Sequence, residues 1–207
     1  MKVALINGSP KSKESISGII LQAVRKRLGN SHDYTVCDVV PFDKAQTLNN
    51  LKNCHAIIFA FPLYVDSIPS HLLRFLDAIK GDIGAFAPDV TVWAIANNGF
   101  YEGHQNAIAL DMMQNFCRSA GLRWGQGIGV GAGGMVSASS INSGLMKNIG
   151  LTFDRLAENI LLSRSAETQF AVPNFPRFLY KAAGNWGWKV QARKNGLKTK
   201  NILDKQA

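Results

Sequence analysis

Hydroxyl side chains gather where the first apolar run of the chain, residues 3–6, ends. The eleven residues that follow contain four serines, Ser9, Ser12, Ser15 and Ser17. An apolar strand that leads through a Gly-Ser loop into a helix presents hydroxyls, backbone N–H groups and the positive end of the helix dipole to an anion. This segment, called the serine loop (residues 8–15), is therefore predicted to bind a phosphate monoester.

The serine loop has a second interpretation. Serine is a common N-cap residue, so the segment could serve only to begin a helix. Gly8 is expected to relieve crowding where the backbone turns, and Pro10 to stiffen the exit from the loop. The spacing G-x-x-x-x-G-K-[ST] of triphosphate-binding loops does not occur here, which disfavours ATP or GTP as the ligand.

Two further segments combine aromatic rings with Pro or Gly. The first aromatic loop (residues 61–69) reads FPLYVDSIP, and the second aromatic loop (residues 97–104) reads NNGFYEGH. A flat conjugated ligand needs ring faces on which to stack and backbone groups for its polar edge. Ligands of open parallel sheets bind beyond the carboxyl ends of the strands, so all three loops are expected on one rim.

The elements that must position these loops alternate between strand-like and helix-like patterns. Five apolar runs predict strands, approximately at residues 2–6, 34–39, 55–61, 90–97 and 122–130. Apolar residues at helical spacing predict helices at residues 16–28, from Pro69 onward, at 108–116 through Ile108, Met112 and Phe116, and at 145–160. Such alternation is typical of a three-layer α/β/α sandwich around a parallel sheet.

Glycine recurs at every second position at Gly125, Gly127, Gly129, Gly131 and Gly133. In a strand this spacing removes every side chain from one face, so that another segment packs on bare backbone or a ligand touches it, and packing is favoured. Residues 129–134 also satisfy G-x-G-x-x-G. A Ser-rich loop follows instead of a helix, so the dinucleotide fingerprint is rejected.

Composition describes an ordinary globular chain of 207 residues, 46% hydrophobic and 18% charged. No apolar run approaches the roughly 18 residues that span a membrane, and Met1-Lys2 leads directly into a strand, so a cytoplasmic protein is expected. The three cysteines are odd in number and outside any C-x-x-C pattern, which predicts buried reduced thiols and neither a disulfide framework nor a metal site.

The net charge of +9 is concentrated at the C-terminal end. Residues 171–207 contain eight Lys or Arg against Asp204 alone, so the preceding 170 residues carry only +2. A domain over residues 1–170 is therefore expected to be followed by a basic extension. Apolar residues at helical spacing occur in it at Phe175, Phe178, Leu179, Ala182, Ala183, Trp186 and Val190. Docking on the same domain or on a dimer mate is favoured over contact with a membrane surface, and specific nucleic-acid binding is not expected.

Together the three loops resemble the flavin-contacting loops of the NADPH-dependent FMN reductase group in the flavodoxin-like superfamily. The likeness rests on Gly8-Ser9-Pro10, on Pro62-Leu63-Tyr64-Val65 and on Asn97-Asn98-Gly99-Phe100-Tyr101-Glu102-Gly103, and it covers roughly residues 1–165. It implies a flavodoxin-like fold with a five-stranded parallel sheet in the order 2-1-3-4-5. The family usually has Arg where Lys11 stands, and often Asn near Ser15.

The resemblance implies a flavin role for each loop. The FMN phosphate would be bound by Ser9, Lys11, Ser15 and Ser17, and Pro10 is also expected among the cofactor-binding residues. The ring and ribityl chain would be bordered by Pro62, Leu63, Tyr64 and Val65. The far edge of the isoalloxazine would be lined by Asn97, Asn98, Gly99, Phe100, Tyr101 and Glu102, with backbone N–H groups around Asn98 and Gly99 stabilising negative charge on the reduced ring.

The implied activity is that of an FMN-dependent NAD(P)H oxidoreductase. NADPH or NADH would give hydride to the flavin, and a small acceptor such as a quinone, a nitro or azo compound or free flavin would take the electrons. Candidate catalytic residues are Tyr101, Glu102 and His104. Either Tyr64 or Tyr101 would stack on the ring, and Glu102 and His104 could transfer a proton or orient the acceptor. A homodimer or larger homo-oligomer is expected. The alternatives are a flavodoxin-type electron carrier, although such carriers are typically acidic, and a flavin-binding regulatory protein that acts through its basic tail.

Overall fold

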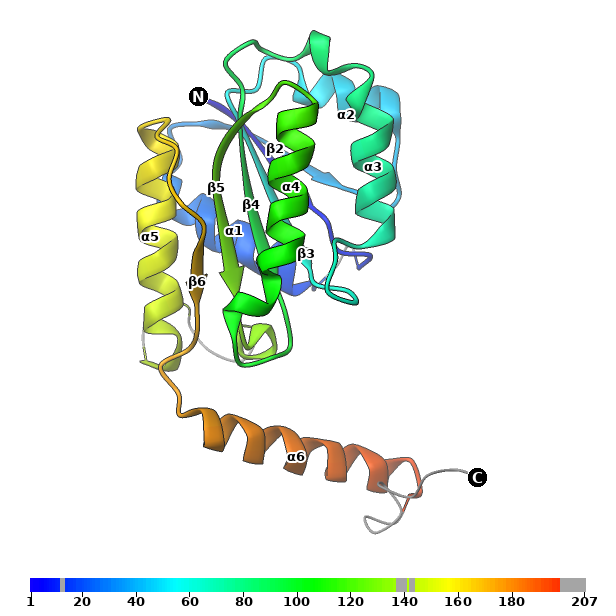
Figure 1. Ribbon diagram of the computed structural model, residues 1–207, viewed down its shortest axis with the longest axis vertical. Helices are drawn as coiled ribbons and strands as arrows, with labels where there is room; N and C mark the ends of the chain where they lie inside the picture. The colour runs from blue at the N-terminus through cyan, green and yellow to red at the C-terminus, as the bar shows by residue number, and fades with distance from the viewer. Residues whose placement is uncertain (12–13, 137–140, 142–143, 198–207) are drawn as a thin grey trace. The chain divides into compact units, whose positions relative to one another are not determined.

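The computed structural model (Figure 1) describes residues 1–11, 14–136, 141 and 144–197. The chain divides into a sheet unit, Met1–Pro173, and a C-terminal unit, Asn174–Ala207. This division lies three residues after the boundary predicted from the charge pattern. The sheet unit extends to Pro173 because Ala171 still pairs with the sheet.

A parallel sheet of six strands forms the centre of the sheet unit. Its order is β2 (Asp33–Asp38), β1 (Lys2–Asn7), β3 (Ala56–Pro62), β4 (Thr91–Asn97), β5 (Arg123–Val130) and β6 (Gln169–Ala171). The predicted order 2-1-3-4-5 is confirmed, but the prediction of five strands is wrong, because β6 adds an edge strand whose Phe170 pairs with Gly129. Three residues are too few for alternation to reveal a strand in the sequence.

Helices cover both faces of the sheet (Figure 1). One face carries α1 (Ile16–Leu28) and α5 (Lys147–Leu161), and the other carries α2 (Lys44–Leu51), α3 (Ser70–Lys80) and α4 (Ala107–Ser119). Short 3-10 helices are η1 (Ile83–Ala85), η2 (Gly103–Asn106), η3 (Gly133–Met135) and η4 (Gly144–Met146). The predicted three-layer sandwich is confirmed. The eight-residue α2 was not predicted, since only Thr47 and Leu51 of it are buried.

The buried side of α4 differs from the predicted one. Ile108, Met112 and Phe116 have helical spacing, but Ile108 is 60% exposed. The residues that pack on the sheet are Ala109, Leu110, Met113 and Cys117. Two adjacent stripes of one helix satisfy the same spacing, and the small side chains of Ala109 and Cys117 weakened the hydrophobic signal of the buried stripe.

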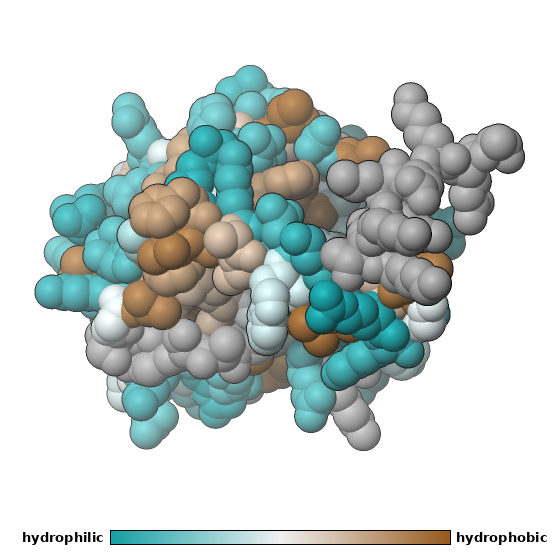
Figure 2. All heavy atoms as spheres, turned by 90° about the horizontal axis from the view of Figure 1, so that it is seen from below, coloured by the Kyte–Doolittle hydropathy of each residue, from teal (hydrophilic) through white to brown (hydrophobic). Residues whose placement is uncertain are grey.

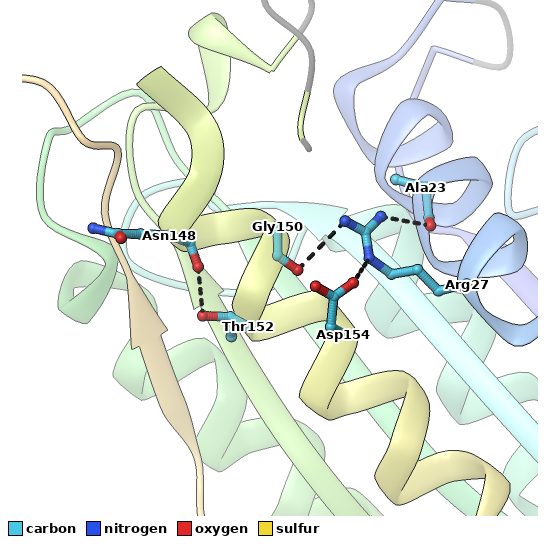
Figure 3. Close-up of polar contacts among 6 residues, drawn as sticks. All are labelled: Ala23, Arg27, Asn148, Gly150, Thr152 and Asp154. Atoms are coloured by element: carbon cyan, nitrogen blue, oxygen red, sulfur yellow. Dashed lines mark hydrogen bonds and ion pairs between the residues drawn. The ribbon is translucent and has the colours of Figure 1, made fainter. Parts of the chain in front are cut away.

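Arg27 joins the two helices of the α1 and α5 layer. Its Nε lies 2.6 Å from Asp154 Oδ1, and its guanidinium donates to the carbonyl oxygens of Ala23 (2.9 Å) and Gly150 (3.4 Å) (Figure 3). Thr152 Oγ1 donates to the carbonyl of Asn148 one turn earlier in α5. Because Asp154 is half exposed, this contact orients the helices more than it stabilises them.

All three cysteines are free, buried thiols, as predicted. Burial raises the pKa of Cys37 and Cys54, and it raises the pKa of Cys117 to about 12. We expect all three thiols to resist a disulfide exchange reagent at pH 8 in the folded protein and to react at once in urea. A thiol that reacts rapidly without unfolding would contradict the buried arrangement.

The same pKa shifts make stability depend on pH. An unfolded thiol loses its proton near about pH 8.5, whereas folded Cys117 keeps its proton up to about pH 12. The folded state therefore binds more protons in this window, and the free energy of unfolding falls as pH rises through it, by at most about 1.4 kcal/mol per pH unit for one thiol. Urea unfolding at several pH values should show a shallower decline in Cys117→Ala than in the parent protein.

The C-terminal unit contains α6 (Arg177–Lys194), which confirms the helix predicted from the spacing in the basic extension. None of its residues is buried. In the part of the chain that the structure describes, no helix combines the length and the apolar character needed to cross a membrane.

Candidate functional site

The three predicted loops follow β1, β3 and β4, which are neighbours in the sheet. Parallel strands lie about 4.8 Å apart, so the ends of β1 and β4 are separated by about 10 Å. Figure 2 shows the molecule from below, where groups of hydrophobic side chains interrupt a largely hydrophilic surface. The fold therefore places the three loops along one rim, as predicted.

Ser15 begins α1. Its hydroxyl accepts a hydrogen bond from the N–H of Gly18 at 3.0 Å and donates to Asn7 Oδ1 at 3.3 Å. The interpretation of the serine loop as a helix cap is thus correct for this residue. The backbone N–H groups of Ile16 and Ser17, in the first turn, have no acceptor within the helix and remain suited to an anion.

Ser9 and Ser17 differ from Ser15 in their hydrogen bonds. Ser9 Oγ accepts from the N–H of Lys11 at 3.2 Å, and Ser17 Oγ accepts from Asn97 Nδ2 at 3.2 Å. A hydroxyl that accepts one hydrogen bond still has its own proton to donate. Ser9 and Ser17 therefore suit a phosphate better than Ser15 does. The Lys11 side chain is exposed, and Ser12 lies outside the described residues.

Asn7, the last residue of β1, organises the serine loop, and sequence reasoning missed it. Its Oδ1 accepts from the N–H of Ser9 at 3.2 Å, while its Nδ2 donates to Asp38 Oδ1 at 2.7 Å and to the carbonyl of Lys11 at 3.4 Å. One buried amide thus fixes the start and the middle of the loop and joins them to β2. The available signal was a polar residue that ends an otherwise apolar buried strand.

Asn97 has the same place at the end of β4 and joins the other two loops. The side-chain Nδ2 donates to the backbone carbonyl of Phe61 at 2.9 Å and to Ser17 Oγ. The backbone carbonyl of Asn97 accepts from the N–H of Leu63 at 2.7 Å. Asn97 is 5% exposed. This predicted cofactor-binding residue thus holds α1, β3 and the first aromatic loop in place.

Gly8 and His71 fix the base of the serine loop. A Cβ at Gly8 would lie 2.7 Å from Phe61 Cβ, so the close approach of β3 requires glycine here. His71 Nε2, in the first turn of α3, donates to the carbonyl of Gly8 at 3.0 Å. This contact gives a structural role to His71.

The first aromatic loop contains a tight hairpin. Tyr64 and Ser67 exchange two backbone hydrogen bonds of 3.0 and 3.1 Å, and the residues between them, Val65 and Asp66, both have positive φ. Positive φ is unfavourable for a β-branched residue, yet Val65 is 98% exposed at the tip. Tyr64 is 47% exposed beside it. The loop therefore presents an aromatic ring and an apolar tip to its surroundings.

Asn98 carries an unpaired polar atom in the second aromatic loop. Asn98 is 5% exposed, and its Nδ2 donates to the carbonyl of Glu102 at 3.1 Å, but its buried Oδ1 has no hydrogen-bond partner. Its backbone N–H donates to the carbonyl of Val130 at 3.1 Å. That N–H is therefore occupied, which corrects the expectation that it stabilises negative charge on a ligand. A Cβ added at the next residue, Gly99, would meet no atom within 4 Å.

The glycine stripe of β5 accommodates the backbone that follows β4. A Cβ at Gly131 would meet the carbonyl oxygen of Tyr101, and one at Gly129 would lie 2.6 Å from the carbonyl oxygen of Gly103. At the other end of the stripe, the ring of Trp93 occupies the space beside Gly125. The packing interpretation is thus confirmed, and the missing side chains allow the second aromatic loop to lie directly on β5.

The three predicted catalytic residues are not equally placed. Tyr101 and Glu102 are half-buried in the segment that packs on β5. His104 lies in η2, where its ring packs edge-on against Phe170 of β6 with centroids 4.7 Å apart. It is thus beside the edge strand, four strand spacings or about 19 Å from β1. The arrangement gives His104 a packing role and leaves Tyr101 and Glu102 as the nearer candidates.

A hollow of about 350 Å³ opens on the other side of the serine loop, between β1, β2 and α1. It is lined by Asn7, Ser15 and the carboxylates of Glu14 and Asp38, among others. Two carboxylates disfavour a phosphate there, so this hollow is not the anion site. Among the described residues, no three His, Cys, Asp or Glu side chains group closely enough to hold a metal ion.

Comparison with known proteins identifies the fold. Residues 1–89 match the family model described as "Flavodoxin-like fold". An apo NADH:FMN oxidoreductase superposes with a TM-score of 0.60 at 16% identity, over 80% of this chain and 91% of that chain. A NAD(P)H:quinone oxidoreductase from Methanothermobacter marburgensis superposes with a TM-score of 0.59 at 16% identity, over 77% and 96%.

A flavodoxin from Streptococcus pneumonia TIGR4 is also similar, with a TM-score of 0.56 at 16% identity over 79% of this chain and 99% of that chain. No curated protein matches the sequence. The predicted flavodoxin-like fold is therefore confirmed. At these identities the superpositions show the fold and not the reaction.

Proposed function

Starting from a chain with the flavodoxin-like fold, we propose that this protein is an FMN-dependent NAD(P)H oxidoreductase that reduces a small acceptor, such as a quinone, a nitro or azo compound or free flavin. One observation carries the proposal. On the rim that bears the N-terminus of α1, the buried Asn98 Oδ1 lacks a donor while Gly99 beside it borders open space. An unsatisfied buried acceptor costs about 1–3 kcal/mol, which an N–H group on the polar edge of a flavin would relieve.

The residues of the rim fit the two ends of FMN. At one end, the hydroxyl protons of Ser9 and Ser17 and the first-turn N–H groups of α1 suit a dianionic phosphate, with the Lys11 ammonium nearby. At the other end, the exposed ring of Tyr64 and the exposed Phe100 offer surfaces for a flat ring. The distance of about 10 Å between the ends of β1 and β4 separates the two groups.

Bound FMN would supply the hydride chemistry, and the protein would supply position and electrostatics. Asn97 holds the first aromatic loop and the start of α1 at a fixed separation. Asn98 Oδ1 would accept a hydrogen bond from the ligand, and the tight packing of the Tyr101 backbone on Gly131 keeps the second aromatic loop from moving away. Glu102 is the carboxylate of this loop, and we assign it to orientation or proton transfer with the acceptor.

The flavin and quinone oxidoreductases among the proteins of similar fold support this proposal, and the flavodoxin supports an electron carrier instead. The visible spectrum of the purified protein, and its response to NADPH and NADH without oxygen, distinguish the oxidoreductase from the electron carrier. Yellow protein that is bleached by either nucleotide supports the oxidoreductase. Bound FMN without bleaching favours the carrier, and protein that takes up no FMN in titration ends both.

Substitution of single serines tests which hydroxyls contact the phosphate. We expect Ser9→Ala to weaken FMN binding about tenfold, because it removes a hydrogen bond to a charged group. Ser15→Ala should lower the free energy of unfolding by about 1 kcal/mol through loss of the helix cap. Fluorescence titration with FMN and urea unfolding measure the two effects.

The exposed Ser119, near the C-terminal end of α4, provides a matched control, since Ser119→Ala should change neither quantity. An unchanged FMN affinity in Ser9→Ala would show that the phosphate does not bind at this loop.

A further inference from the structure

A strained residue lies at the tip of the first aromatic loop. Tyr64 and Ser67 pair across a two-residue turn, and the residues within it, Val65 and Asp66, have φ angles of 50° and 55°. Turns with two positive φ angles favour Asn and Gly, and Asp also tolerates the left-handed region. A β-branched side chain does not, because its Cβ substituents crowd the backbone there. Asn in place of Val65 would therefore form the same turn with less strain.

The Val65 side chain has almost no contact with the rest of the chain. It is 98% exposed, so it buries very little apolar surface against the residues that the structure describes. Neither packing nor removal from water therefore offsets the strain of its backbone. Residues that persist in sparsely populated conformations cluster at ligand-binding and active sites. Contact with a molecule from outside the chain would account for both the strain and the exposure.

The turn lies in the middle of the rim. It follows β3, whose neighbours in the sheet are β1 and β4, and the N–H of Leu63 donates to the carbonyl of Asn97 at 2.7 Å. Tyr64 is 47% exposed, and the proposed function assigns its ring to the flavin. Val65 is the next residue, at the tip. It is therefore placed to contact a molecule that approaches a flavin on this rim.

The charged side chains of the two aromatic loops are carboxylates. The first loop contains Asp66 and the second contains Glu102, whereas the basic residues Lys11 and Arg74 belong to the serine loop and to the second turn of α3. Asp66 is exposed and directly follows Val65, so a molecule that contacts the valine lies close to this carboxylate. At short range a carboxylate repels an anion but not a neutral molecule. The turn therefore disfavours a ligand with a negative group at this position.

Building on the proposed function, we propose that Val65 and Asp66 select the electron acceptor, and that this acceptor is an uncharged compound with an apolar substituent, such as an alkyl-substituted quinone. Val65 packs on the substituent, and Asp66 disfavours anions such as sulfonated azo compounds and free FMN. The reaction is that of the proposed function. A hydride from NAD(P)H, passed through the flavin, and one proton from solvent convert the quinone to the hydroquinone and leave NAD(P)⁺.

Two quinones that differ in one substituent test this selection. Menadione is an uncharged methyl-substituted naphthoquinone, and in naphthoquinone sulfonate a sulfonate replaces the methyl group. The acceptor ratio is kcat/KM for menadione divided by kcat/KM for the sulfonate, measured on the full chain loaded with FMN and with NADPH or NADH as donor. Each variant is compared with the parent protein on the same pair, so the difference in reduction potential between the two quinones cancels.

Val65→Asn removes the apolar contact and keeps the turn. We expect the acceptor ratio to fall about tenfold through a loss in kcat/KM for menadione, the lower end of the effect of one methyl-sized contact. Relief of strain should raise the folding equilibrium constant about fivefold in urea unfolding. The affinity for FMN should stay within about twofold of the parent value. Leu162→Asn, at a 60% exposed leucine beside the start of β5, is the matched control and should change none of these quantities.

Asp66→Asn removes the charge at a residue where Asn also tolerates positive φ. We expect the acceptor ratio to fall about threefold at low salt, through a gain in kcat/KM for the sulfonate. This effect should fade as salt is added, whereas that of Val65→Asn should persist, because only the first is electrostatic. Asp89→Asn makes the same change in net charge at an exposed residue before β4 and should leave the ratio unchanged.

The outcomes separate this inference from the proposed function. A protein that reduces neither quinone refutes the proposed function and the inference with it. A protein that reduces both, with a ratio unchanged in either variant, refutes the inference alone. FMN affinity about tenfold weaker in Val65→Asn would assign the valine to the cofactor, and a smaller mass of this variant in sedimentation equilibrium would assign it to a second copy of the chain. A Val65→Asn variant no more stable than the parent would show that the turn is not strained.

Each of the last three results would also overturn the inference.

Discussion

Gly131→Ala is expected to destabilise the sheet unit by about 3 kcal/mol and to move the second aromatic loop away from β5. The added Cβ would overlap the carbonyl oxygen of Tyr101 and lie 2.7 Å from the N–H nitrogen of Gly103. Both are backbone atoms, which cannot turn aside as a side chain can, so the whole segment must shift. Urea unfolding measures the loss of stability, and FMN titration measures the displacement, which we expect to weaken binding.

Gly134→Ala is the control for this prediction, three residues further along the chain. A Cβ there would meet no atom within 4 Å, so the substitution should alter stability by less than about 0.5 kcal/mol. If Gly131→Ala unfolds at the same urea concentration as Gly134→Ala, the close contact between the second aromatic loop and β5 does not exist in solution.

Asn97→Asp is expected to cost about 3 kcal/mol at neutral pH with almost no change in size. The Nδ2 group that donates to the carbonyl of Phe61 and to Ser17 Oγ would become a carboxylate oxygen, and a buried negative charge would face a carbonyl at 2.9 Å. Such a charge is unpaired and desolvated. We expect weaker FMN binding as well, because the start of α1 and the first aromatic loop lose their common anchor.

The pH dependence separates this electrostatic cause from a general loss of packing. Burial would raise the pKa of the new carboxyl above its unfolded value of about 3.9, so the folded state binds the proton more tightly. The stability deficit should therefore shrink as pH falls toward about 4 and grow as pH rises above it. The exposed Asn49 of α2 gives the control Asn49→Asp, which should cost little at either pH. A deficit in Asn97→Asp that does not change with pH would contradict the buried-charge explanation.

These two predictions concern the same feature, the connection of loops that lie far apart in the sequence. Asn7 joins the serine loop to β2, Asn97 joins α1 to β3, and Gly131 allows the second aromatic loop to lie on β5. The candidate site is therefore held by residues that end or flank the strands and whose side chains need touch no ligand. Its geometry is set by the sheet, and the loops only present the ligand-facing groups.

Some sequence patterns were sufficient to predict the structure, because they depend only on residues that are close together in the chain. Buried strands of a parallel sheet must be apolar on both faces, which made β1, β3 and β4 visible as continuous runs. The loops at the ends of these strands share one rim as a direct consequence of parallel order. The helix of the C-terminal unit was also predicted, since apolar spacing of about 3.6 residues is a property of the segment itself.

Other features were decided only when the strands came together. Which serine caps the helix, and which serines keep a hydroxyl proton to donate, depends on where the amides of Asn7 and Asn97 lie, and these come from different strands. The same holds for β6, for the buried side of α4 and for the place of His104 beside Phe170. The amino-acid sequence alone determined the first five strands, the alternation of strands and helices, and the shared rim, because hydrophobic periodicity is encoded residue by residue. The tertiary structure decided which polar groups are satisfied and which remain free, because a hydrogen bond between distant segments exists only after the sheet has formed.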